Sequence, residues 1–99
     1  MANVIVQGVF VVDPGERDRF IEASLDGMRS SRKEEGCLEY VFAPDPLDPA
    51  RVVLSERWES MDLLQQHLKG LRSRPAVDRP EPQSSEIVLY EVASAKRMV

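Results

Sequence analysis

Four short segments rich in β-branched and aromatic residues are separated by two longer amphipathic stretches in this chain of 99 residues. The four segments are too short to favour helices, and we predict strands over residues 4–12, 37–43, 51–58 and 87–93. Three prolines in residues 44–49 exclude both helix and sheet there, so this loop joins the second and third strands as an antiparallel pair.

Two helices are predicted between the strands. The first begins at Asp13 or Gly15, runs for roughly five turns, and ends at Gly36, with acidic residues in its first turn and basic residues near its end, as the helix dipole favours. Ser60 caps the second helix, and the spacing of its apolar residues gives it one core face: Met61, Leu64, Leu68 and Leu71. Three prolines make residues 75–85 an irregular or short helical connection.

The resulting order, β-α-β-β-α-β, is that of a ferredoxin-like α+β sandwich. Such a fold has one antiparallel sheet with both helices on one face. We expect residues 1–99 to form a single domain, with its core in residues 4–93 and a short tail at residues 94–99.

The predicted strands are apolar on both faces. In the first strand Val4, Val6 and Phe10 alternate with Ile5 and Val9, whereas a sheet with one wet face alternates apolar with polar residues. Two helices cover only one face, so we expect a homodimer in which the sheet faces pack together. The alternative is a monomer with an apolar surface patch that soluble proteins rarely tolerate.

Composition excludes several classes of function. The net charge is −4 and no basic block is present, which argues against binding to nucleic acid or to an anionic membrane surface. The single cysteine, Cys37, excludes an internal disulfide and a cysteine-based metal site. No signal peptide or membrane-spanning run is visible, so we expect a cytoplasmic protein.

Two rare side chains are candidates for chemistry. His67 is the only histidine, and imidazole is the side chain best suited to proton transfer near neutral pH. It lies at the edge of the apolar stripe of its helix, where it either points into a cleft or stays half-exposed. Trp58, at the end of the third strand, is either a flat wall for an aromatic ligand or a plug for the corner between sheet and helix.

Polar residues within the strands are further candidates. Gln7 interrupts an apolar strand and either binds a ligand or makes a structural hydrogen bond. Three glutamates occupy strand positions, and at least one is expected to face inward with a hydrogen-bond partner, or with Arg51 or Arg57 as an ion-pair partner: Glu39, Glu56 and Glu91. A buried acid–base role is the other interpretation. The chain lacks a phosphate loop, a dinucleotide fingerprint and a nucleophile elbow, so we expect no flavin, nicotinamide or tightly held metal.

Three short motifs carry a family resemblance. Gly-Cys-Leu-Glu-Tyr at residues 36–40, Glu-Arg-Trp-Glu-Ser at residues 56–60 and His-Leu at residues 67–68, in this element order, resemble the antibiotic biosynthesis monooxygenase domain family. The resemblance implies a dimeric α/β barrel with a pocket between sheet and helices in each subunit. For members similar to quinol monooxygenases it implies oxidation of a small quinol or polycyclic phenol by O₂ without a cofactor.

The resemblance also implies site residues. His67 is the expected base, and Trp58 is expected to form one wall of the pocket. The expected substrate-binding residues are Gln7, Tyr40, Glu56 and Arg72. Arg72 occupies the position of a second histidine in many members. The Asn and Tyr that accompany the tryptophan in members oxidising aromatic polyketides are Leu54 and Leu64 here, so that catalytic set does not transfer. The alternatives are a non-catalytic dimeric ligand-binding or stress-response domain, or an oxygen-independent isomerase or cyclase.

Overall fold

The computed structural model describes residues 3–99 and confirms the predicted α+β order. Its four strands form one antiparallel sheet in the order β2-β3-β1-β4. The elements are β1 (Val4–Val11), the 3₁₀ turn η1 (Pro14–Glu16), α1 (Arg17–Ala23), α2 (Leu25–Arg32), β2 (Cys37–Pro44), β3 (Arg51–Trp58), α3 (Met61–Leu71) and β4 (Ser84–Glu91).

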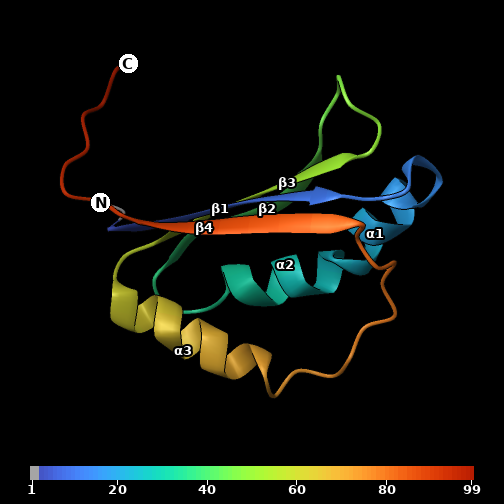
Figure 1. The fold of residues 1–99 in the computed structure, drawn as a ribbon. Helices are drawn as coiled ribbons and strands as arrows, with labels where there is room; N and C mark the ends of the chain where they lie inside the picture. The colour runs from blue at the N-terminus through green and yellow to red at the C-terminus, as the bar shows by residue number, and fades with distance from the viewer. Residues whose placement is uncertain (1–2) are drawn as a thin grey trace.

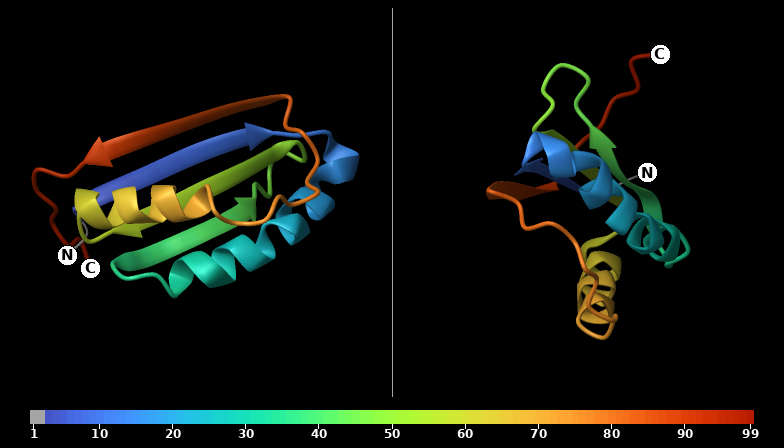
Figure 2. Two further views of the ribbon diagram at one scale, coloured as in Figure 1. Left: turned by 90° about the horizontal axis from the view of Figure 1, so that it is seen from below. Right: turned by 90° about the vertical axis from the view of Figure 1, so that its right-hand side faces the viewer.

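The helices lie on one side of the sheet. Figure 1 shows the sheet nearly edge-on, with α2 and α3 on the same face, and the two views of Figure 2 agree. The opposite face carries no helix within residues 3–99. None of the helices described is long and apolar enough to cross a membrane.

The first predicted helix is not continuous, which corrects the sequence-based expectation. The structure has two consecutive helices, α1 and α2, that meet at Ser24. The Ser24 hydroxyl donates to the carbonyl of Phe20 at 2.9 Å, and its backbone N–H bonds to Ile21 three residues back. Serine hydroxyls that bond to the preceding turn bend helices, so this residue marks the junction.

The fourth strand is shifted from its predicted range. It runs over Ser84–Glu91 instead of residues 87–93, because Ser84 already pairs with Val11 of β1. The preceding segment, residues 75–83, contains no helix. It is tied to β1 at its end by the Gln83 N–H, which donates to the Val11 carbonyl at 2.7 Å.

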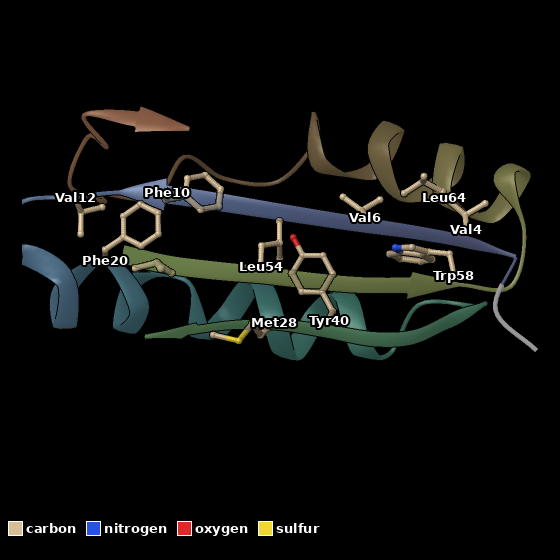
Figure 3. Packing of buried hydrophobic residues seen from close by; sticks show 11 residues of the cluster. Val4, Val6, Phe10, Val12, Phe20, Met28, Tyr40, Leu54, Trp58 and Leu64 are labelled. Atoms are coloured by element: carbon tan, nitrogen blue, oxygen red, sulfur yellow. The ribbon is translucent and has the colours of Figure 1, made fainter. Parts of the chain in front are cut away.

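The core lies between the sheet and the helices. Alternate residues of β1 and β3 face inward and pack against Phe20, Met28 and Leu64 from the helices (Figure 3). Burying side chains of this size stabilises a fold by about 1.5–3 kcal/mol each. The inward-facing residues of these two strands that belong to the core are Val4, Val6, Phe10, Val52, Leu54 and Trp58.

Gly36 lies in the turn between α2, which ends at Arg32, and β2, so the predicted helix end at Gly36 is four residues too late. Its φ of 81° lies in the left-handed region, which side chains disfavour, and a Cβ there would collide with Leu63 of α3. Its carbonyl accepts from the Glu59 N–H at 2.9 Å. A glycine at this point therefore lets β2 and α3 approach closely.

Candidate functional site

A pocket of about 370 Å³ lies between the inner face of the sheet, α3 and the segment of residues 75–83. Its size suits a small organic ligand. The lining is mostly aliphatic and aromatic, from all four strands and α3, and its polar side chains are Tyr40, Glu56, His67 and Arg79.

His67 is held rigidly at one end of this pocket. Its exposed fraction is 2%, so the half-exposed interpretation is wrong. The ring packs against Trp58, with 4.6 Å between ring centres, and against Tyr40 at 5.4 Å. Because both neighbours come from strands that face α3, the imidazole plane is fixed by packing.

A carboxylate orients the imidazole. His67 Nδ1 lies 2.6 Å from Oε1 of Glu34, and a carboxylate only accepts hydrogen bonds, so Nδ1 carries the proton. The other ring nitrogen, Nε2, makes no hydrogen bond within residues 3–99. Every fully buried side-chain nitrogen in these residues has a hydrogen-bond partner, so Nε2 is not fully buried. Because His67 lines the pocket, Nε2 is its ring nitrogen that is available to accept a proton from a ligand.

Glu34 is itself fixed by a cation. The Arg74 guanidinium donates to Glu34 Oε1 at 3.1 Å and to the Ser31 hydroxyl at 3.3 Å. Neither Glu34 nor Arg74 was identified from the sequence. Glu34 lies 33 residues before His67, just beyond α2, where a glutamate has the pattern of an ordinary surface charge.

Trp58 plugs the corner between β3 and α3. Its side chain is fully buried, it does not line the pocket, and its indole N–H donates to Glu56 Oε1 at 2.9 Å. The surface presented to a ligand is made instead by His67 and Glu56 beside it. The tryptophan thus shapes the site from behind.

Glu56 is the buried glutamate of the sheet, 6% exposed. Burial raises the pKa of its carboxyl, while the Trp58 N–H and His67 act in the opposite direction. Glu39 pairs instead with Arg57 on the uncovered face at 3.6 Å, and Arg51 pairs with Asp45. A carboxyl with a raised pKa beside an imidazole is an arrangement common in functional sites.

Tyr40 faces the same pocket from β2. Burial, and next the nearby Glu56 charge, raise the pKa of its phenol to about 12. The phenol therefore stays neutral across physiological pH and keeps a proton that it can donate. Its ring stands edge-on to His67 at 62°.

Two predicted site residues lie outside the pocket. Gln7 is exposed on the other face of β1, where it lines a hollow of about 430 Å³ on the uncovered side of the sheet. Successive side chains of β1 point to opposite faces of the sheet, and those of Val4 and Val6 face inward instead. Arg72 caps the end of α3 and is exposed. These placements leave Tyr40, Glu56 and His67 together in one pocket, with Trp58 behind them.

Within residues 3–99 no three histidine, cysteine, aspartate or glutamate side chains cluster in a way that could hold a metal ion. The polar groups at the His67 end of the pocket are instead a hydrogen-bonded imidazole, a carboxyl and a phenol. Together they can bind a hydroxyl group and accept its proton.

An antiparallel sheet with helices on one face and a histidine-containing pocket between them defines a ferredoxin-like α+β domain with a candidate ligand pocket. The model of the family described as antibiotic biosynthesis monooxygenase matches residues 3–79, and the chain belongs to this family.

Solved structures resemble this chain in fold, and a relative resembles it in sequence. A Deinococcus radiodurans protein named for the same family matches with a TM-score of 0.77 at 18% identity, covering 97% of this chain and 98% of that one. A conserved protein of Methanosarcina mazei Go1 matches with a TM-score of 0.71 at 23% identity, covering 92% and 93%. An uncharacterized protein of Synechocystis sp. is 24% identical over 98 residues, which are 96% of this chain and 67% of the relative.

Proposed function

We propose that this protein is a cofactor-independent monooxygenase that oxidises a small quinol or polycyclic phenol with O₂. The observation that carries the proposal is the buried His67, whose Nδ1 is held by Glu34 while Nε2 is open to an apolar pocket. Membership of the antibiotic biosynthesis monooxygenase family supports the same reaction class.

The imidazole acts as the general base. Nε2 takes the proton from the substrate hydroxyl, and the resulting imidazolium lies between the Glu34 carboxylate and the new phenolate. Because the phenolate is electron-rich, it passes an electron to O₂. One oxygen atom then forms a bond to a ring carbon, and the other leaves as water. The substrate supplies all the electrons: quinol plus O₂ gives hydroxyquinone plus water.

The remaining pocket groups orient the substrate. The neutral Tyr40 phenol donates a hydrogen bond to the developing oxyanion, and Glu56 accepts one from a second hydroxyl. The apolar side chains of the pocket exclude water. The Phe42 ring and the aliphatic Leu64 side chain in the pocket lining suit a flat aromatic substrate.

We also propose that the protein works as a homodimer through the uncovered faces of two sheets, forming a dimeric barrel. That face carries half-buried apolar side chains, Ile5, Val9, Val41, Val53 and Val88, and no helix within residues 3–99 covers it. A stable interface buries about 800 Å² on each partner. Light scattering at micromolar concentration should give a mass near twice that of the chain, and a stable monomer would contradict this proposal.

Oxygen uptake by chelator-treated protein tests the reaction. The protein is offered a panel of dihydroquinones and naphthols, with His67→Ala alongside and circular dichroism as the control for folding. We expect uptake above autoxidation in the wild type and about 10²–10⁴-fold less in the variant, the usual worth of a general base. Binding without uptake would indicate a ligand-binding domain, and product formed without oxygen would indicate an isomerase or cyclase.

A further inference from the structure

Arg79 is the cation of the pocket, and within residues 3–99 it has no carboxylate partner. It lines the pocket, and its guanidinium lies 4.5 Å from the ring centre of Phe20 and 5.9 Å from that of Phe10. None of the salt bridges or side-chain hydrogen bonds within residues 3–99 involves it. A cation–π contact uses none of the guanidinium N–H groups in a conventional hydrogen bond, so these donors stay free for a ligand.

The backbone around Arg79 is anchored. Pro80, the next residue, is buried, and a proline restricts the residue before it to an extended conformation. Three residues further on, Gln83 hydrogen-bonds to Val11 of β1. The guanidinium is therefore presented at a defined place on the pocket by a segment that both contacts hold to the sheet.

The two polar ends of the pocket are well separated. Arg79 lies beside Phe10 of β1. Glu56 pairs across the sheet with Val6, which is four residues from Phe10 along β1. At about 3.3 Å per residue this is roughly 13 Å of strand. Figure 3 shows Phe10 and Phe20 at one end of the core and Trp58, which contacts His67, at the other. The surface between them is apolar.

We infer that the substrate carries a carboxylate at the end remote from its reacting hydroxyl, and that Arg79 binds this carboxylate. The hydroxyl end of this inference rests on the function proposed above. A planar bicyclic or tricyclic phenol has the length and flatness to connect His67 with Arg79 while its rings cover the apolar floor. A guanidinium matches a carboxylate with two parallel hydrogen bonds.

Anaerobic calorimetry with three matched probes tests the inference. The probes are 6-hydroxy-2-naphthoic acid, its methyl ester and 2-naphthol, which share one ring system and differ in charge. The proteins are the wild type, Arg79→Gln and Arg29→Gln. Arg29 is an exposed arginine of α2 outside the pocket, so its variant controls for the loss of one charge.

We expect the acid to bind the wild type about tenfold to a hundredfold more tightly than either neutral probe, as for a charge-assisted hydrogen bond. Arg79→Gln should abolish this advantage without changing the affinity for 2-naphthol, and Arg29→Gln should retain it. Equal binding of all three probes by the wild type would overturn the inference. So would an equal loss for all three in Arg79→Gln, which would make Arg79 only a packing residue.

If Arg79→Gln fails to fold, measurements on the wild type alone test the inference. An advantage of acid over ester that shrinks between 50 and 500 mM salt supports an ionic contact, and no advantage contradicts it. Acid binding through Arg79 without oxygen uptake in the aerobic assay would leave this inference standing and remove the proposed function. Oxygen uptake together with equal binding of all three probes would support the proposed function and overturn this inference. Failure of all three probes to bind would contradict both.

Discussion

At its α3 end the pocket is backed by Trp58, which is fully buried, whereas at its other end it is bounded by Arg79, which is exposed. The first end is a closed network in which Arg74, Glu34 and His67 are joined by hydrogen bonds. The second end is a single guanidinium stacked on a phenylalanine ring.

The difference separates two tasks within one site. Polar groups that are buried and hydrogen-bonded have one geometry, which a proton transfer requires. An exposed guanidinium with free donors contributes little to the fold and keeps its hydrogen bonds for a ligand. We therefore propose that the α3 end positions the reacting hydroxyl and that the Arg79 end selects the substrate.

The largest expected effect concerns stability at the buried end. Trp58→Ala should lower the free energy of unfolding by about 3–5 kcal/mol, because it empties a fully buried site and leaves Glu56 without its indole donor. Arg79→Ala should cost about 1 kcal/mol or less, the worth of an exposed cation–π contact. Urea unfolding of the two variants at one protein concentration measures both losses. Equal losses of unfolding free energy would contradict the proposed difference between the two ends.

The next effect concerns the orientation of the imidazole. Glu34→Gln keeps the size of the side chain but removes the charge that holds Nδ1–H, and we expect kcat to fall about 10–100-fold, as when carboxylate partners of functional histidines are removed. Glu35→Gln, its exposed neighbour, is the matched control. A change in KM alone would show that Glu34 affects binding and not proton transfer.

A smaller effect concerns Glu56 and pH. Burial raises the pKa of its carboxyl in the folded state, so the folded protein holds this proton more tightly than the unfolded chain does. Wild-type stability from this group therefore declines as pH rises from the unfolded value through the raised folded value. Glu56→Gln keeps an acceptor for the Trp58 N–H and removes that decline. Urea unfolding at pH 4 and pH 7 should show the variant gaining relative to the wild type at the higher pH, and a relative loss would contradict this assignment.

The smallest effect is expected at Arg72. It is exposed at the end of α3 and does not line the pocket, so Arg72→Gln should change stability by no more than about 0.5 kcal/mol. Substrate affinity should also stay unchanged, unlike that of Arg79→Gln for an acidic probe. A marked loss of affinity in the Arg72 variant would place the selective cation on α3 instead.

Much of the fold followed from local pattern. The prediction for β3 matches its observed range, and the Ser60 cap is confirmed because its side chain accepts from the Leu63 N–H. The junction at Ser24 was missed because a serine within an apolar stripe does not reveal whether its hydroxyl bonds to the preceding turn. The early start of β4 was missed because Ser84 and Ser85 enter the sheet by pairing with β1 and not by their own propensity.

The site divides in a similar way. His67 and Trp58 were found because each occurs once in the chain. The face of Gln7 was not determined, since both sets of alternating residues in its strand are apolar and only the tertiary fold shows which one meets the helices. Arg79 lies in a segment without periodicity, and Glu34 meets His67 only because the turn after α2 lies beside α3. Contacts distant in sequence leave no local signal.

The single histidine allows one direct measurement of the central claim. Nitrogen-15 NMR of the imidazole in its neutral form should show the proton on Nδ1 and a bare Nε2, because Glu34 accepts from Nδ1. Adding a naphthol under nitrogen should then shift the Nε2 signal as it accepts the substrate hydroxyl. A proton on Nε2, with Nδ1 bare, would contradict the account, since the nitrogen facing the pocket would then be unable to act as the base.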